Sequence, residues 1–199
     1  ATGKPQTIKE AVDLVNSLPK PMDAACFIQS LERPLQVSLT SSTSSAQPAY
    51  DSHNPRVFIF SGKLIISIVT AGPGSQVLEL GEQLENFRSV KGEIPLPITG
   101  SITLEVPFAH LLSNRSTSCG FCHANENLVT SGEYSSFKAY VSTALQPRIS
   151  TLVPIDKLQY ELNACDPKID PDRCKLLRAI FSYGQVVSTF FPSLMPGGF

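Results

Sequence analysis

The sequence predicts an α+β fold with short N-terminal helices, a central antiparallel β-sheet or sandwich, and a helical C-terminal third. Three observations support this: an amphipathic start, a middle rich in short apolar segments, and two capped helical patterns near the end. The 199 residues are 42% hydrophobic and 17% charged, as in chains that bury a core. We expect a single domain over 1–199, divided into a helical start (1–33), a β-rich block (34–108) and a C-terminal part (109–199).

Residues 7–18 carry the first helical pattern. Thr7 and Glu10 have the spacing of a capping box, and apolar residues then recur every three or four positions. Asp23 is a good N-cap residue and predicts a second short helix over 24–31.

The middle of the sequence consists of short segments rich in valine, isoleucine, leucine and phenylalanine, separated by turn residues. This pattern is typical of an antiparallel meander or sandwich. Residues 40–56 predict a long polar loop, and the acidic segment over 78–86 is interpreted as a solvated strand edge or loop. The segments that we expect to be strands are 35–42, 56–61, 63–70, 75–82, 93–98 and 101–108.

The C-terminal third is expected to be mainly helical. Residues 134–145 fit a strand or a helix, and both interpretations stay open. Residues 154–165 predict a helix with Asp156 as its cap. The helix over 170–184 is better marked, because Asp170 can cap it and a proline occupies its first turn.

Charge and hydropathy exclude several classes of function. The 16 basic and 17 acidic residues are nearly balanced, so nothing indicates nucleic acid as a partner. No apolar run approaches the roughly 20 residues that span a bilayer, so we expect no transmembrane segment.

Two of the five cysteines flank a short acidic loop with two prolines, "CDPKIDPDRC". A loop of this kind fits a local disulfide between Cys165 and Cys174. Such a bond would imply an oxidising compartment, most simply a bacterial periplasm or an extracellular location. The alternative is two reduced thiols in a cytosolic protein.

The segment "CGFCH" places two cysteines and a histidine in one pentapeptide, at Cys119, Cys122 and His123. Two thiols about one helical turn apart can add to the two vinyl groups of one porphyrin, and the following imidazole can then bind the iron. In this motif the chain resembles the c-type cytochromes. The resemblance covers these five residues and a possible Met-Pro element at 195–196.

The resemblance implies one covalently attached haem c, with His123 as an axial ligand of the iron. Met195 is then the leading sixth ligand and His110 its rival, and a vacant or water-bound sixth position stays open. It also implies a periplasmic role in single-electron transfer or in haem-based ligand binding, with a redox partner protein.

Three other interpretations of the motif stay open. Cys119 and Cys122 can form a disulfide with each other or with Cys26, as expected for a haem-free, disulfide-stapled extracytoplasmic binding or interaction module. The three motif side chains can bind zinc with Cys26 or His110 as the fourth ligand. The two motif cysteines can also act as a redox dithiol.

Overall fold

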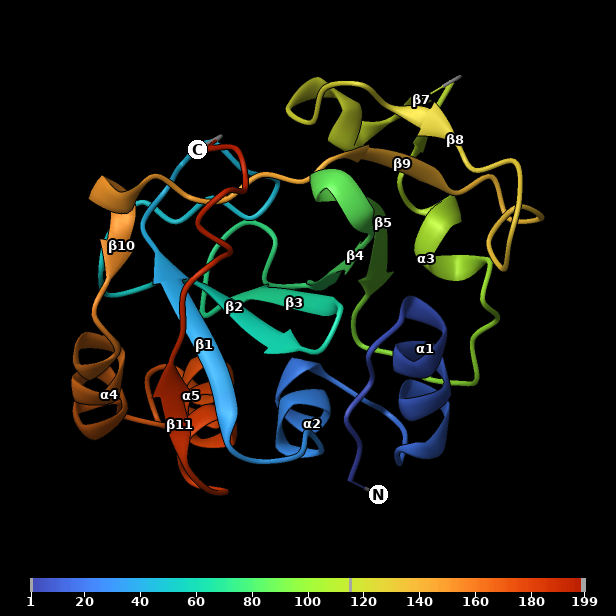
Figure 1. The fold of residues 1–199 in the computed structure, drawn as a ribbon. Coiled ribbons are helices and arrows are strands. Elements are labelled where there is room, and N and C mark those ends of the chain that lie inside the picture. Colours follow the sequence, from blue (N-terminus) through green and yellow to red (C-terminus); the bar gives the residue numbers. More distant parts are fainter. Residues whose placement is uncertain (1, 115, 198–199) are drawn as a thin grey trace.

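The computed structural model describes residues 2–114 and 116–197 and confirms the α+β class (Figure 1). The helices are α1 (Ile8–Ser17), α2 (Ala24–Gln29), α3 (Val106–Ala109), α4 (Ile155–Ala164) and α5 (Pro171–Phe181). The 3-10 turns are η1 (Glu85–Phe87), η2 (Ser118–Phe121) and η3 (Ile149–Thr151). The strands are β1 (Leu35–Thr40), β2 (Arg56–Ser61), β3 (Leu64–Val69), β4 (Val77–Gln83), β5 (Arg88–Pro95), β6 (Leu112–Ser113), β7 (Ser116–Thr117), β8 (Asn127–Leu128), β9 (Tyr140–Thr143), β10 (Leu152–Val153) and β11 (Val186–Ser188).

One large sheet forms the centre of the structure, in the order β10-β1-β2-β3-β4-β5-β9-β8. Neighbours along this path are antiparallel. Strand β11 pairs in parallel with β1, along the same edge as β10, so the sheet is mixed. Of the two predicted arrangements, a sheet or a sandwich, the chain adopts the sheet. Gly62 permits the tight β2–β3 turn because its φ is +60°, a conformation that side-chain-bearing residues rarely adopt.

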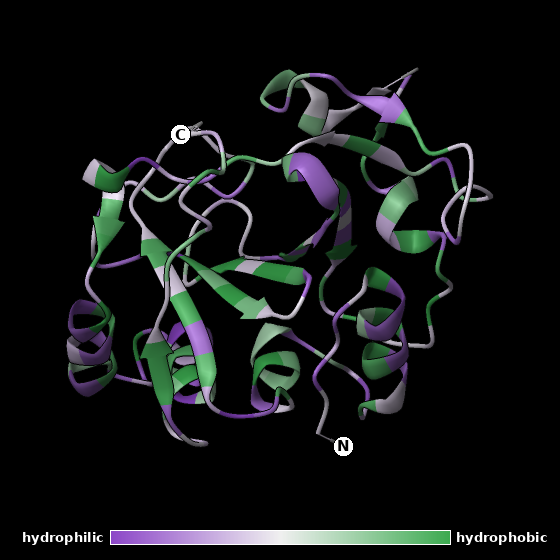
Figure 2. Ribbon diagram, in the orientation of Figure 1, coloured by the Kyte–Doolittle hydropathy of each residue, from purple (hydrophilic) through white to green (hydrophobic). Residues whose placement is uncertain are grey.

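Side chains alternate between the two faces of β2 to β5, as the pleat of a strand requires. One face is apolar and packs with α1, α2 and α5 into the main buried core, which lies on the helical side in Figure 1 and is coloured green in Figure 2. The residues of β2 to β5 in this core are Val57, Ile59, Leu64, Ile66, Ile68, Leu78, Leu80, Val90 and Ile94.

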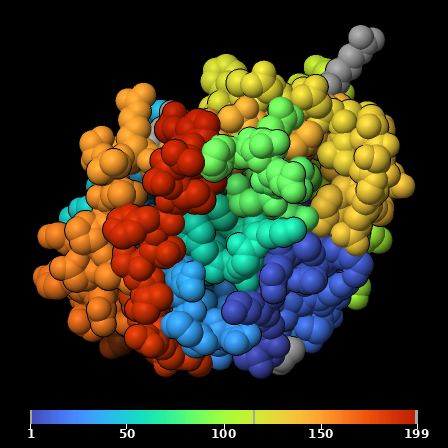
Figure 3. Space-filling model, in the orientation of Figure 1, coloured from blue at the N-terminus to red at the C-terminus, as the bar shows by residue number. Residues whose placement is uncertain are grey.

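The opposite face of the same strands carries charged and polar side chains beside a second, smaller apolar cluster. That cluster consists of Phe58, Ile65, Ala144, Phe191 and Met195. Phe191 lies in the C-terminal tail, drawn in red in Figure 3, and its ring meets the Phe58 ring edge-on, with centroids 5.0 Å apart. The tail therefore contributes to the covering of the face that the helices leave open.

The predicted helix caps are confirmed. Thr7 Oγ1 accepts a hydrogen bond from the Glu10 backbone N–H at 3.1 Å, and Asp23 accepts one from the Cys26 N–H at 2.8 Å. Asp170 caps α5 in the same way, through the Arg173 N–H. These side chains accept backbone donors that have no partner within the first turn of a helix.

Two predictions near the β-rich block were wrong. Residues 101–105 form no strand, and α3 replaces the end of the expected strand because Pro107 suits the first turn of a helix. Of the segment predicted as a strand over 93–98, only residues 93–95 belong to a strand, β5, which runs from Arg88 to Pro95.

Two smaller predictions also need correction. Asp156 does not cap α4: the N-cap residue is Pro154, and Asp156 lies inside the first turn. The acidic segment over 78–86 is only partly solvated, because Glu82 is buried and accepts hydrogen bonds from the Ile8 N–H at 2.9 Å and the Tyr134 hydroxyl at 2.5 Å. The ambiguous segment 134–145 contains a strand, β9.

The predicted disulfide between Cys165 and Cys174 is present and joins the end of α4 to α5. None of the helices within residues 2–114 and 116–197 has the length and apolar character needed to cross a bilayer.

Replacing Cys165 and Cys174 together with alanine should lower the free energy of unfolding by about 2–3 kcal/mol, because the bond closes a loop that constrains the unfolded chain. Urea denaturation of the two proteins measures the difference. Adding a reductant should lower the free energy of unfolding of the wild type by the same amount and should leave that of the double variant unchanged. Equal stability of the oxidised wild type and the variant would contradict the prediction.

Candidate functional site

A hollow opens on the charged face of the sheet and is the best-formed candidate site. Its water-accessible volume is about 110 Å³. The empty space rises to about 850 Å³ when the open region at its mouth is included. Strands β2 to β5 supply its floor, and four segments distant in sequence supply its walls. The wall residues include Ser44, Ser45, Ala46, Ser118, Cys119, Cys122, His123, Ala144, Leu145 and Phe191.

Arg56 is the central cation of the floor. Its guanidinium donates to Ser67 Oγ at 2.6 Å, to Ser45 Oγ and to Glu79 Oε2, and it lies 4.6 Å from the centre of the Phe58 ring. The side chains of Arg56 and Glu79 are only 10% and 17% exposed, so water screens this ion pair weakly. The pair therefore fixes the position of one carboxylate oxygen at the floor.

The polar loop over 40–56 is tied to the sheet by the same network. Besides the bond from Arg56 to Ser45, the Ser67 hydroxyl donates to Gln47 Oε1 at 2.7 Å. The Gln47 amide in turn donates to the carbonyls of Gly74 and Val77 at 3.1 and 2.9 Å. The loop thus becomes a fixed wall of the hollow.

Two carboxylates lie directly opposite each other on the floor, because Glu79 of β4 pairs with Glu93 of β5. The pKa of Glu93 is raised above its ordinary value, mainly because burial disfavours the charged carboxylate and also because the charge of Glu79 lies close. The hydrogen bond with His110 opposes this rise. Arg56 and His110, whose Nδ1 lies 2.9 Å from Glu93 Oε2, offset the repulsion between the carboxylates.

Lys91 brings a second cation to the floor. Its Nζ donates to Ser89 Oγ at 2.6 Å and would lie 3.8 Å from a Cβ at Gly81, its partner in the strand pairing. The missing side chain of Gly81 leaves room for the ammonium. Burial lowers the pKa of Lys91 to about 8, because removal from water disfavours the charged form.

The CGFCH motif forms one helical turn on the wall of the hollow. The N–H groups of Cys122 and His123 both donate to the Cys119 carbonyl, at 3.1 and 2.9 Å. Glu126 closes the loop by accepting from the Thr117 N–H at 2.9 Å. A Cβ at Gly120 would meet the Glu126 carboxylate at 2.9 Å, so the glycine of the motif permits this close approach.

The imidazole of His123 is held in one tautomer. Its Nδ1 lies 2.8 Å from the Thr143 carbonyl oxygen, which can only accept, so Nδ1 carries the hydrogen. Burial and the neighbouring Lys91 charge lower the pKa of His123 to about 4, so the ring is neutral at pH 7. Nε2 therefore keeps a lone pair that can bind a metal or accept a proton.

The motif cysteines are free thiols in this structure and form no disulfide with each other or with Cys26. Burial, reinforced by Glu79 and Glu93, raises the pKa of Cys119 to about 12. A thiol exchanges with disulfides only as the thiolate, so this thiol is poorly suited to redox exchange. Cys26 belongs to another site, beside Asp23 and Lys175.

The two predicted rivals for the sixth iron position lie outside the lining of the hollow. Met195 is 4% exposed and packs with Phe58, Ile65 and Phe191; these three line the hollow, but Met195 does not. His110 is half-exposed and pairs with Glu93. Within residues 2–114 and 116–197, no three histidine, cysteine, aspartate or glutamate side chains are arranged to hold a metal ion.

The sequence pattern alone did not identify Arg56, Glu79 and Lys91 as site residues. A weak indication was present in two of the strands, because Glu79 alternates with Leu78 and Leu80, and Lys91 follows Val90, so each lies on the face opposite the apolar residues. A charge on a predicted strand is usually solvated, and only the covering loops bury these three.

No protein-family model, curated protein or solved structure matches this chain.

The lowered pKa of Lys91 has a measurable consequence in the haem-free polypeptide. In protein labelled at lysine Cε, one resonance should titrate near pH 8 and disappear in Lys91→Met, while exposed lysines titrate at about 10.4. Between pH 8 and 10.5 the unfolded chain binds a proton that folded Lys91 has released, so stability relative to Lys91→Met should rise with pH. A Lys91 midpoint near 10 would contradict the prediction.

Proposed function

We propose that this chain is a c-type haem protein of an oxidising extracytoplasmic compartment. One haem would be held by thioether bonds to Cys119 and Cys122, with His123 Nε2 as the protein ligand of its iron. The observation that carries this proposal is the hydrogen bond from His123 Nδ1–H to the Thr143 carbonyl. Metal-binding histidines usually donate their second ring N–H in this way, which fixes the ring and leaves the other nitrogen basic.

The residues around the motif fit a haem. The two thiols lie one helical turn apart, as attachment to one porphyrin edge requires, and Cys122 is exposed where a macrocycle could enter. The hollow beside them is open to solvent and has a water-accessible volume of about 110 Å³, so a macrocycle attached at the motif would lie over its mouth and not inside it.

A bound haem would supply one-electron chemistry and a coordination position for a small ligand. The chain's own part would be to orient the His123 ring through Thr143 and to keep it neutral by burial. Because neither Met195 nor His110 lines the hollow, we favour ligand binding at the sixth position over electron transfer with a thioether ligand. A redox partner protein is still required to set the oxidation state of the iron.

The disulfide supports the proposed location. A bond between Cys165 and Cys174 persists in oxidising compartments, and haem c attachment in bacteria takes place on exported chains.

Expression with export and cytochrome maturation machinery should give a coloured protein with the mass of one added haem. Acid acetone should not extract the colour, since thioether bonds hold the porphyrin. Replacing Cys119 and Cys122 with alanine should abolish attachment, while the matched control Cys26→Ala should retain it.

A colourless wild-type protein of unmodified mass, produced where a known c-type cytochrome matures, would refute the haem proposal. That outcome would favour the haem-free extracytoplasmic binding module, with the hollow as its working part.

The sixth ligand is tested separately by Met195→Ala in the haem-bound protein. With Met195 outside the hollow, we expect no far-red sulfur-to-iron absorption band in the wild type and the same visible spectrum in the variant. A far-red band that Met195→Ala removes would instead assign the methionine as ligand and favour electron transfer.

A further inference from the structure

The floor of the hollow holds two half-buried side chains of opposite charge, Glu79 and Lys91, whose bonding capacity is unfilled. Glu79 Oε1 is buried and has no hydrogen-bond partner, although Oε2 of the same carboxylate is taken by Arg56. Lys91 Nζ, with three donors, makes one hydrogen bond within the described residues, to Ser89. Unsatisfied buried groups in a native protein are costly and call for a partner that the protein itself does not supply.

The strand register explains why these two groups share one site. Glu79 pairs with Glu93 and Gly81 pairs with Lys91, so Glu79 and Lys91 are diagonal neighbours on the same face of β4 and β5. The backbones of diagonal neighbours on two paired strands lie about 7–8 Å apart. Gly81 lies opposite Lys91 and two residues from Glu79 on β4, and because it has no side chain it leaves space beside the two charged ends.

The other charges on the floor already have partners. Arg56 pairs with Glu79 through Oε2, and Glu93 pairs with His110. No ion pair joins Lys91 to Glu79 or to any other carboxylate among residues 2–114 and 116–197. A molecule inserted between the two groups can therefore bond to both without displacing an existing ion pair.

We propose that Glu79 and Lys91 bind a small zwitterion, an α-amino acid with a short apolar side chain. Its ammonium would donate to Glu79 Oε1, and Lys91 Nζ would donate to its carboxylate. The side chain would lie toward Phe58, Ile65 and Phe191, the apolar part of the lining.

The size of the hollow limits the ligand. Its water-accessible volume of about 110 Å³ is somewhat below the roughly 150 Å³ of a cavity that admits benzene. Glycine and alanine, with five and six non-hydrogen atoms, are of the right order, and phenylalanine is too large. The inference goes beyond the haem proposal and does not depend on it, because β4 and β5 supply both polar contacts.

Isothermal titration calorimetry with L-alanine tests the inference on the full chain, both with and without haem maturation. We expect one site per chain for alanine and at least about tenfold weaker binding of propionate and ethylamine, which each lack one charged group. Phenylalanine should bind at least about tenfold more weakly than alanine, because the apolar wall leaves no room for its ring.

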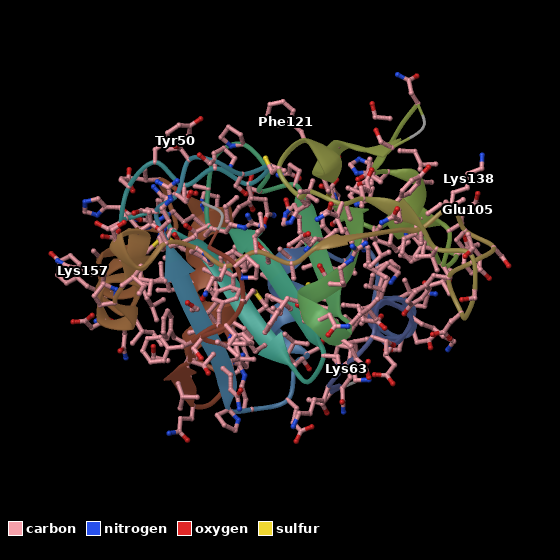
Figure 4. The ribbon with its side chains drawn as sticks, turned by 45° about the horizontal axis from the view of Figure 1, so that its top comes forward. Tyr50, Lys63, Glu105, Phe121, Lys138 and Lys157 are labelled. Atoms are coloured by element: carbon pink, nitrogen blue, oxygen red, sulfur yellow. A yellow bond between two sulfur atoms is a disulfide. The ribbon has the colours of Figure 1, made fainter. Side chains whose placement is uncertain are left out.

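Lys91→Met should weaken alanine binding at least about tenfold, because one charge-assisted hydrogen bond is lost. The matched control Lys63→Met changes a lysine on the β2–β3 turn, far from Phe121 of the motif in Figure 4, and should bind alanine as the wild type does. Glu79→Gln is the second variant; its amide is uncharged, and it should weaken binding to a similar extent even if Lys91→Met fails to fold.

Three results would overturn the inference. The first is no heat of binding for alanine in either form of the wild type, which would leave ordered water as the partner of these groups. The second is propionate binding as tightly as alanine, which would remove the ammonium contact. The third is unchanged alanine binding in a folded Lys91→Met or Glu79→Gln protein. A colourless wild type would refute the haem proposal alone and leave this test intact.

Discussion

The ion pair between Arg56 and Glu79 is the interaction on which the polar half of this molecule depends. It joins β2 to β4, and through Ser67 and Ser45 it also fixes β3 and the polar loop that covers them. Removing one partner of such a buried pair typically costs about 3–5 kcal/mol, because the other charge is left without compensation. Two apolar side chains at these positions would stabilise the sheet equally well. Charged side chains that stay buried despite this energetic cost are typical of functional sites.

The two faces of the sheet differ: one packs into the main apolar core, and the other lines the hollow. On the helical side, alternate residues of β2 to β5 join α1, α2 and α5 in one continuous apolar core. On the other side, loops and the C-terminal tail cover the strands only partly and leave the hollow. The floor is therefore rigid, because a packed core supports it from behind, while the walls come from irregular segments that side-chain hydrogen bonds hold in place.

The motif turn meets this floor through contacts that span long distances in sequence. The ring of His123 is oriented by the Thr143 carbonyl, and its proton affinity is lowered by burial and by Lys91. The Cys119 thiol is kept protonated by burial and by the floor carboxylates. A protonated thiol is a poor reagent for thiol exchange, whereas a neutral imidazole keeps a lone pair on Nε2 that can bind a metal or accept a proton.

The sequence by itself determined the local features: the caps at Thr7, Asp23 and Asp170, most strands of the sheet, the disulfide across nine residues and the CGFCH turn. Each depends on groups a few residues apart, whose geometry the local backbone sets. Only the tertiary structure decided that Glu79 and Lys91 share a buried floor, that Thr143 orients His123, and that Met195 packs outside the hollow. These outcomes depend on strand register and on how loops cover a sheet, which no short stretch of sequence specifies.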